Sequence, residues 1–343
     1  MSINTMFPPL SAKGGKRNRN KGQQQSQQQN FQQQTPQKTE KPAAKVEQSP
    51  KPSPSFNLPD LPPETCQLIA DLADIEKRLD SLNALSVIAD KHPDLAIPLW
   101  YSYGTVVILL EEIVSVYPYI SGKHKETLAV SSYSLIQRVC KALALLQTIA
   151  SHPKTQHFLI GIDIIYFLTP IFALTQVERE IEYLRLTSLG VIGAMSKTRD
   201  PQIVKYLMDK EVLMICIVSI QHAAEISRVI ATFILSKLFS ESTALENVCE
   251  TPQKILSIAN LLCHSIVTTV MQKRDVNGRL VRYSLDCLNR LSTNPKATPQ
   301  LHSVVTEYKG LFKDHLLEYI VSKEPSLKPK YDEFCRNISF SPK

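Results

Sequence analysis

Apolar side chains recur three and four positions apart through most of this chain, from about Leu58 onward. That spacing places them on one face of an α-helix, whereas a half-buried strand alternates apolar and polar residues. Four apolar runs each end in a short polar turn, which is followed by a second, shorter helix-like run. These runs with their turns cover residues 143–153, 186–201, 230–242 and 285–295.

The polar turns repeat at similar intervals. Pro153, Pro201, Ser242 and Pro295 are separated by 48, 41 and 53 residues. A repeat of roughly 40 to 47 residues is typical of armadillo and HEAT proteins, in which one unit cannot bury its apolar face alone and stacks on its neighbours. The sequence therefore predicts an all-α, armadillo-like helical repeat solenoid. Stacked repeats expose long concave surfaces, which favours a binding scaffold.

Three stretches test this interpretation. The short β-branched runs 106–110 and 214–220 continue the helical period of their neighbours, so we expect helix there rather than strand. Residues 255–272 carry no formal charge, but polar side chains such as Asn260 and His264 interrupt them. A buried central helix is therefore expected there rather than a membrane span. Trp100 begins an apolar helical pattern and is expected in the core.

Composition divides the chain into three parts. Residues 1–56 hold Gln blocks followed by alternating Pro and Lys, with few large apolar side chains. Such a segment cannot bury enough apolar surface to offset its chain entropy, so we expect a disordered low-complexity tail. Residues 57–322 form the predicted repeat domain. Residues 323–343 show little periodicity and are expected to be a loosely attached C-terminal tail.

The positive charge lies in the N-terminal tail. The whole chain has 39 Lys and Arg against 32 Asp and Glu, a net charge of +7. The tail alone has nine basic and two acidic residues, also +7, so the remainder of the chain, with 30 basic and 30 acidic residues, is neutral. The sequence therefore gives the domain no overall charge for nucleic-acid binding, although a local basic stripe is compatible with it. Residues 13–21 suit either an RNA contact or import signal, or a solvated spacer.

Seven cysteines occur without a paired short spacing, and their number is odd. Neither a disulfide framework nor a zinc module fits this pattern, which favours a reducing compartment. The first residues lack a charged start followed by an apolar core, so no secretion signal is expected.

The sequence predicts no enzyme, cofactor or metal site, because it contains no phosphate loop, nucleophile elbow, zinc-protease or kinase motif. The acidic pair Glu111 and Glu112 and the Glu178, Glu180 and Glu182 series are expected to be solvated charges. Cys263 and His264 are neighbours that point about 100° apart on a helix, which does not suit a nucleophile and its base. His152 and His157 have no third ligand nearby.

Surface binding is the remaining chemistry. The last helix of each armadillo unit lines the concave face, so runs 183–190 and 227–234 are expected to line a groove. Tyr183, Gly190 and Ile230 are the candidate peptide-groove residues, with Arg185, Arg228 and Phe233 beside them. Such grooves bind amphipathic helices that insert apolar residues at i, i+3, i+4 and i+7. Structural packing is the alternative role for these side chains.

Six strings carry a resemblance to a known family. They are residues 94–104 (DLAIPLWYSYG), 112–118 (EIVSVYP), 138–147 (RVCKALALLQ), 150–153 (ASHP), 182–194 (EYLRLTSLGVIGA) and 231–235 (ATFIL). In unbroken order they resemble the "required for cell differentiation" family, which supplies the armadillo-repeat subunit of the CCR-NOT deadenylase complex. The resemblance covers about residues 61–316, whereas residues 121–134 and those beyond 316 depart from it, as in a divergent member or paralogue.

The resemblance implies a non-catalytic adaptor. Family members dock on the Not scaffold protein and recruit RNA-binding regulators, which promotes mRNA deadenylation, decay and translational repression. Their concave groove binds amphipathic-helix peptides, and the motif match places Tyr183, Gly190 and Ile230 in it. The resemblance also implies a cytoplasmic location, including P-bodies, and a nuclear one, with no membrane partner. Self-association as a homodimer stays open.

A second binding feature of the family is degenerate here. Its tryptophan pockets use the strings Cys-Gln-Thr-Tyr-Glu-Arg and Asn-Pro-Arg, where this chain has CETPQK at 249–254 and NPK at 294–296. Pro252 stands where the family has an aromatic wall, and Lys254 and Lys296 replace arginines. Lysine neither stacks nor forms a planar fork as arginine does. We therefore expect weakened tryptophan capture.

A competing hypothesis is a single-stranded nucleic-acid-binding repeat protein. It would use the basic tail and a groove lined by Arg185, Arg228 and Arg282. Direct nucleic-acid contact would then depend strongly on salt.

Overall fold

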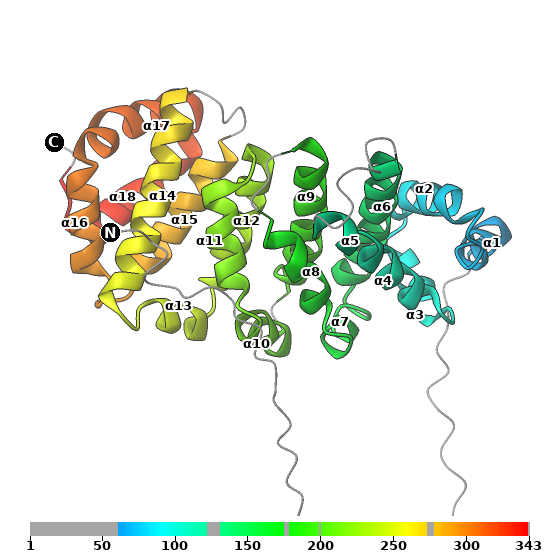
Figure 1. Cartoon of the computed structure of the whole chain (residues 1–343). Helices are drawn as coiled ribbons and strands as arrows, with labels where there is room; N and C mark the ends of the chain where they lie inside the picture. The colour runs from blue at the N-terminus through cyan, green and yellow to red at the C-terminus, as the bar shows by residue number, and fades with distance from the viewer. Residues whose placement is uncertain (1–60, 122–130, 175–177, 199, 273–277, 342–343) are drawn as a thin grey trace, which may run out of the picture. The chain divides into compact units, whose positions relative to one another are not determined.

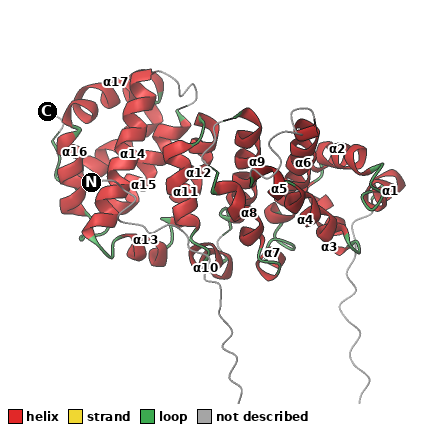
Figure 2. Cartoon of the chain, viewed as in Figure 1, coloured by secondary structure: helices red, strands yellow, loops and turns green. Residues whose placement is uncertain are grey.

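The computed structural model describes residues 61–121, 131–174, 178–198, 200–272 and 278–341. Contacts separate Met1–Asn57 from Leu58–Lys343, and the described residues all belong to the second unit. The expected disordered tail, 1–56, lies outside them. Within the described ranges all regular structure is helical and no strand occurs (Figure 2). The all-α expectation is thus confirmed, including the β-branched runs 106–110 and 214–220.

Five long helices pack side by side in one row. Each contacts the next along the chain, and α2 packs on the first of them. In the armadillo scheme these are the third helices of five successive units (Figure 1). They are α6 (Ser131–Ser151), α9 (Arg179–Met195), α12 (Glu225–Leu238), α15 (Arg279–Ser292) and α18 (Lys328–Asn337).

A second row covers one side of the first. It consists of the second helices of the units, each of which contacts the next. They are α4 (Thr105–Ser115), α8 (Ile164–Phe172), α11 (Val212–His222), α14 (Pro252–Gln272) and α17 (Leu316–Lys323), the last preceded by a π-helical turn at Leu311–His315. The two rows bury one continuous apolar core between them, which is how stacked repeats are stabilised.

The shorter first helices complete each unit. They are α3 (Ala96–Tyr101), α7 (Phe158–Gly161), α10 (Pro201–Asp209), α13 (Ser242–Val248) and α16 (Thr298–Glu307). Pro201 and Ser242 begin helices, as the predicted turns require. Three elements lie before the first unit: α1 (Pro63–Asp71), α2 (Arg78–Ala89) and a 3-10 turn at Pro93–Leu95. Two short elements lie within the rows: α5 (Tyr117–Ile120), which follows α4, and a second 3-10 turn at Pro325–Leu327, which precedes α18.

Each unit therefore has three helices, whereas the sequence pattern indicated two. The break between the first and second helices is made by one residue with positive φ: Gly104 (80°), Asp163 (52°) and Glu211 (55°) in the first three units. Asp163 is held there by the Tyr206 hydroxyl, which donates to Oδ1 at 2.9 Å, and by Lys210 Nζ at 2.6 Å from Oδ2. Non-glycine residues rarely adopt this conformation, so composition does not reveal the break.

The uncharged segment 255–272 is the core helix that the sequence predicts. It belongs to α14, whose Ile258, Leu262 and Ile266 are buried against neighbouring helices. Among the described residues α14 alone is long and apolar enough as a single helix to cross a membrane, and 44% of its apolar window is already buried inside the protein.

The C-terminal segment corrects the sequence interpretation. Contrary to the expectation for the segment 323–343, residues 323–341 are not loosely attached, because α18 packs on α15 as the fifth helix of the first row. Tyr331, Phe334 and Cys335, at i, i+3 and i+4, are buried, and the Tyr331 hydroxyl donates to the Phe312 carbonyl. The apolar stripe spans only two turns and is surrounded by Lys, Asp, Glu and Arg, so its period is hard to detect in the sequence.

Glu112 also differs from its expected role. Its side chain is only 2% exposed, whereas that of its neighbour Glu111 is 61% exposed. One Glu112 oxygen lies 3.0 Å from Arg78 Nη1 of α2, and the other accepts from Arg138 of α6. This carboxylate therefore joins α2, α4 and α6 at the start of the row. The expectation of a solvated charge holds for Glu111 and is wrong for Glu112.

We expect Glu112→Gln to destabilise the fold by about 3–5 kcal/mol, because it leaves two arginines facing a neutral buried group. Glu111→Gln is the matched control, with an expected change within about 0.5 kcal/mol. Urea unfolding of the full chain, followed by circular dichroism, measures both. Equal midpoints for the two variants would contradict the role of Glu112.

Candidate functional site

The exposed strip of the third helices carries the predicted groove residues. On α9, Tyr183 and Gly190 are seven positions apart and therefore share a face. On α12, Ile226, Ile230 and Phe233 share a face in the same way. Tyr183 is 43% exposed and Ile226 60% exposed, whereas Ile230 and Phe233 are half-buried and packed against the core. The strip is thus apolar and open to solvent.

Two glycines bring α9 close to its neighbours. A Cβ atom on Gly190 would lie 2.3 Å from Gln147 Oε1 of α6, so the side-chain amide occupies the space above this glycine. A Cβ atom on Gly193 would lie 3.7 Å from Ile230 Cγ2 of α12. Gly190 and Gly193 are one turn apart on α9. Gly193, rather than Gly190, is therefore the glycine that faces Ile230. The assignment of Gly190 and Ile230 to one peptide-binding groove stays a prediction.

An aromatic and cationic rim surrounds Tyr183. Arg179 Nη2 donates to the Tyr183 hydroxyl at 3.1 Å, and the guanidinium carbon lies 5.5 Å from the Tyr183 ring centre. That hydrogen bond, above all, raises the pKa of Arg179, with a smaller contribution from Tyr133 of α6. Tyr133 is itself 55% exposed. These rings offer apolar area with a polar edge, which suits a peptide interface.

The strip continues onto α15. Phe233 meets Tyr283 edge to face, with ring centres 5.3 Å apart. One turn further along α12, Lys237 Nζ lies 5.4 Å from the Phe233 ring centre. We call the strip formed by α6, α9, α12 and α15 the groove. Its chemistry changes from apolar around Ile230 to cationic at Lys237, a feature that sequence reasoning missed because Lys237 is a single charge in an apolar run.

The basic residues proposed for nucleic acid do not form one surface. Arg185 is only 3% exposed and donates to Glu182 and to the Leu174 carbonyl, so it does not line the groove. Arg282 Nη2 lies 3.0 Å from Glu324 Oε2. Arg228 is half-buried, with an enclosed Nε. The expectation of a groove rimmed by these arginines is wrong for Arg185. Its hydrogen bonds hold the side chain in the interior of the protein.

The degenerate tryptophan-pocket residues lie at two turns. Pro252 is exposed and begins α14, and Lys254 Nζ is 2.7 Å from Glu250 Oε2. Lys296 is exposed in the turn after α15. Burial raises the pKa of the Cys249 thiol and Lys296 partly opposes this, which places the two close together. Weakened tryptophan capture stays a prediction.

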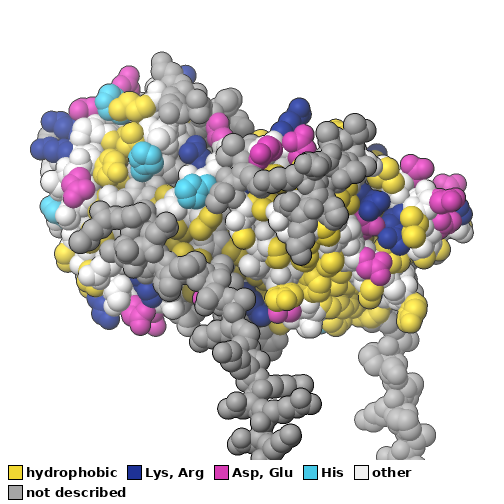
Figure 3. All heavy atoms as spheres, viewed as in Figure 1, with side chains coloured by type: hydrophobic (Ala, Val, Ile, Leu, Met, Phe, Trp, Pro, Cys, Tyr) yellow, Lys and Arg dark blue, Asp and Glu magenta, His cyan; other side chains and the backbone are white. Residues whose placement is uncertain are grey.

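A second exposed apolar surface was not predicted. Exposed large apolar side chains lie on α3, α4 and α8 and in the turn between α3 and α4, and we call them the apolar face: Tyr101, Tyr103, Val107, Val114 and Tyr166. Figure 3 shows hydrophobic side chains gathered over these helices. The signal in the sequence was the run 105–110, in which almost every residue is apolar, since one helix face cannot bury all of them.

Beneath the apolar face the rings of two units are joined. Trp100 is half-buried and stacks on Phe158 with ring centres 4.8 Å apart, in agreement with its expected core role. Tyr101 meets Phe158 edge to face. The exposed side chains therefore stand on a rigid base rather than on a mobile loop.

The candidate reactive groups are far from catalytic geometry. Cys263 is fully buried and His264 exposed, and burial raises the pKa of the thiol, which suppresses the reactive thiolate. His152 Nε2 lies 3.3 Å from Asp94 Oδ1. Within the described ranges no three His, Cys, Asp or Glu side chains come together as a metal site.

Comparison with known proteins identifies the family to which this chain belongs. The profile of the cell differentiation family, Rcd1-like, matches residues 68–338, which includes all five units and α18. The chain belongs to the Rcd1-like cell differentiation family. The resemblance stated from the sequence is thereby confirmed, and the family match runs past its expected end near residue 316.

Two relatives show how far this Rcd1-like chain has diverged. It is 35% identical to the cell differentiation protein rcd1 of Schizosaccharomyces pombe over 239 residues, which is 70% of this chain and 81% of that protein. It is also 35% identical to the protein CAF40 of Saccharomyces cerevisiae over 216 residues, 63% of this chain and 56% of CAF40. It is therefore a divergent member of the family.

A solved structure supports the fold alone. The crystal structure of an engineered protein aligns with 80% of this Rcd1-like chain and 98% of its own length, with a TM-score of 0.55 and 14% sequence identity.

We expect Ile230→Glu to weaken the binding of amphipathic helical peptides by more than about tenfold, because a charge would be desolvated where an apolar side chain is required. Peptides selected on the wild-type chain from a displayed helical library serve as probes, with fluorescence anisotropy as the measurement. Val321→Glu, at an exposed apolar position on α17, is the matched control and should bind normally. Loss of the helical circular dichroism signal in Ile230→Glu would instead assign Ile230 to the core.

Proposed function

We propose that the chain is a non-catalytic adaptor subunit of the CCR-NOT complex. It docks on the Not scaffold and recruits RNA-binding regulators, which promotes mRNA deadenylation, decay and translational repression. The observation that carries this proposal is the family match over residues 68–338, together with two separate exposed surfaces suited to polypeptides. An adaptor needs two such surfaces, one for the complex and one for the recruited protein.

The apolar face is the proposed scaffold-docking surface. Tyr103 is fully exposed, Tyr166 is 71% exposed and Val107 is 59% exposed. A cluster of large apolar side chains in water is unfavourable by itself and marks an interaction site in soluble proteins. Its aromatic residues are of the type that supplies most of the binding energy at interfaces. A permanent partner such as a complex subunit suits so apolar a surface.

The groove is the proposed site for regulator peptides. Ile230 offers apolar surface to a partner helix, Tyr183 provides an aromatic wall, and the Gln147 amide above Gly190 offers a polar contact. The groove is formed by third helices, whereas the apolar face is formed by first and second helices. Scaffold and regulator can therefore be bound together, which is the physical requirement of recruitment.

The proposal places the protein in the cytoplasm, including P-bodies, and in the nucleus, where mRNA regulators act. It assigns no chemical step to the chain. We do not extend it to a nucleic-acid groove, since Arg185 is buried and Arg282 is paired with Glu324.

Affinity purification of the full chain from native extract tests the proposal. The wild-type protein is expected to recover the Not scaffold and RNA-binding regulators. The double variant Tyr103→Asp, Val107→Glu should recover about tenfold less scaffold or lower, because two charges enter an apolar contact. Ile230→Glu should keep the scaffold and lose the regulators. A clean wild-type preparation without scaffold would contradict membership of the complex.

A further inference from the structure

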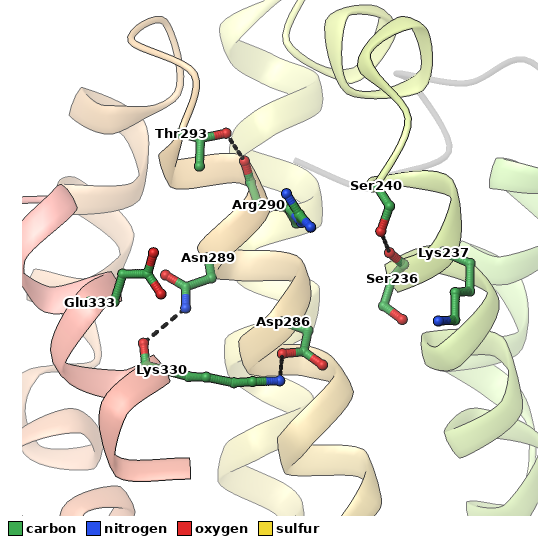
Figure 4. Close-up of a pocket in the computed structure, with 9 residues that line it drawn as sticks. All are labelled: Ser236, Lys237, Ser240, Asp286, Asn289, Arg290, Thr293, Lys330 and Glu333. Carbon is green, nitrogen blue, oxygen red and sulfur yellow. Dashed lines mark hydrogen bonds and ion pairs between the residues drawn. The ribbon is translucent and has the colours of Figure 1, made fainter. Parts of the chain in front are cut away.

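A hollow of about 360 Å³ lies at the cationic end of the groove. It is lined by the last turns of α12 and α15 and by the first turns of α18 (Figure 4). Phe233 and Lys237 stand one turn apart on α12, and Tyr283 and Asp286 stand one turn apart on α15. The hollow is therefore continuous with the apolar part of the groove.

Two cations face this hollow without a carboxylate partner. Lys237 projects from α12 and Arg290 from α15, toward the space between these helices (Figure 4). Both side chains are exposed, and neither takes part in an ion pair within the part of the chain that the structure describes. Lys237 Nζ lies over the Phe233 ring, 5.4 Å from its centre.

The nearby carboxylates do not neutralise them. Asp286 accepts from Lys330 of α18. This ion pair joins α15 to α18, and the negative charge of Asp286 is therefore already paired. Glu333 comes from α18, on the other side of α15 from Lys237 (Figure 4). With the Lys330–Asp286 pair set aside, the lining of the hollow keeps two cations, Lys237 and Arg290, against the single carboxylate of Glu333, a net charge of +1.

Helix ends alone do not account for this arrangement. Basic residues are favourable in the last turn of a helix, because carbonyl groups point outward there. Here hydroxyls already satisfy several of these carbonyls: Ser236 donates to Phe233 O at 2.7 Å, Ser240 to Ser236 O at 3.0 Å and Thr293 to Arg290 O at 2.7 Å. The hydroxyl hydrogens are thus used, and the two cations remain the donors available to an incoming group.

We propose that this hollow binds an anionic side chain of the polypeptide helix that occupies the groove. The anionic group is a carboxylate of Asp or Glu, or a phosphoryl group on Ser or Thr, held between Lys237 and Arg290. This inference rests on the proposed peptide-binding function of the groove and adds a preference for peptides that carry an anionic side chain at one position. Ile230 and Lys237 are seven residues apart on α12, which is about 10 Å. The anionic group of the partner therefore lies about 10 Å from its apolar anchor.

A displayed library of helical peptides, selected on the full chain, provides the test. Wild-type selections are expected to enrich apolar residues at i, i+3 or i+4, and i+7, together with Asp or Glu at a fixed offset. Selections on the double variant Lys237→Glu, Arg290→Glu should keep the apolar pattern and lose or reverse the acidic preference. Lys205→Glu, an exposed position on α10 outside the groove, controls for net charge.

Fluorescence anisotropy of one selected peptide gives the magnitude. Replacing its Glu by Gln should weaken binding about three- to tenfold on the wild-type chain and less than about twofold on the double variant. A phosphoserine version that binds tighter than Glu identifies a phosphoryl group as the favoured source. The uncharged variant Lys237→Gln, Arg290→Gln should remove the preference without reversing it, and equal helical circular dichroism shows that the fold is kept.

The outcomes separate the two levels of inference. Peptides with the apolar pattern but no acidic preference would overturn the anionic site and leave the groove standing. Recovery of no apolar-patterned peptide would overturn the groove itself, and the site with it. If single-stranded poly(A) RNA loses affinity for the double variant while peptide selections are unchanged, the cations bind nucleic-acid phosphate and the proposal is wrong.

Discussion

Burial of each third helix on two sides at once is the constraint on which the structure depends. α9 touches α6 on one side and α12 on the other, so that residues around most of its circumference are apolar and enclosed. Only the strip with Tyr183 and Gly190 stays in contact with solvent. The same holds for α12 and α15, and the aligned strips form the groove. The binding surface is therefore what remains after the core is complete, and its residues are fixed by the packing beneath them.

Close approach of the helices sharpens this surface. At Gly193 an added Cβ would make an ordinary contact with Ile230 at 3.7 Å, and at Gly190 the Gln147 amide already occupies the space that a Cβ would fill. Interiors are packed as densely as organic crystals, so a floor of this kind hardly deforms. The proposed partner helix would gain affinity there, because the receiving surface needs little reordering. Charge then distinguishes the two ends of the groove, apolar at Ile230 and cationic at Lys237 and Arg290.

The sequence reveals what depends on local period and misses what depends on single contacts. Helical spacing and proline turns predict the repeats, the core helix α14 and the shared face of Tyr183 and Gly190. Three features are hidden. Asp163 and Glu211 break helices through a conformation that their chemistry disfavours, and it is stabilised by partners such as Tyr206, 43 residues from Asp163. Glu112 looks solvated because its partners Arg78 and Arg138 lie on other helices. Arg185 looks exposed because its bonds to Glu182 and to the Leu174 carbonyl leave no periodic signal. The apolar stripe of α18 is too short to stand out among charges.

The position of α18 has a thermodynamic consequence. In a linear array, units interact only with their nearest neighbours, so an end unit has one supporting interface where inner units have two. Among the described units, local opening therefore costs less free energy at either end of the row than in its middle. α18 also forms one wall of the hollow beside Arg290. A molecule bound in the hollow would therefore contact α18 together with α12 and α15 and hold the fifth unit against the fourth. Binding in the hollow and local opening of the fifth unit then become linked equilibria, so a molecule bound in the hollow stabilises that unit against opening.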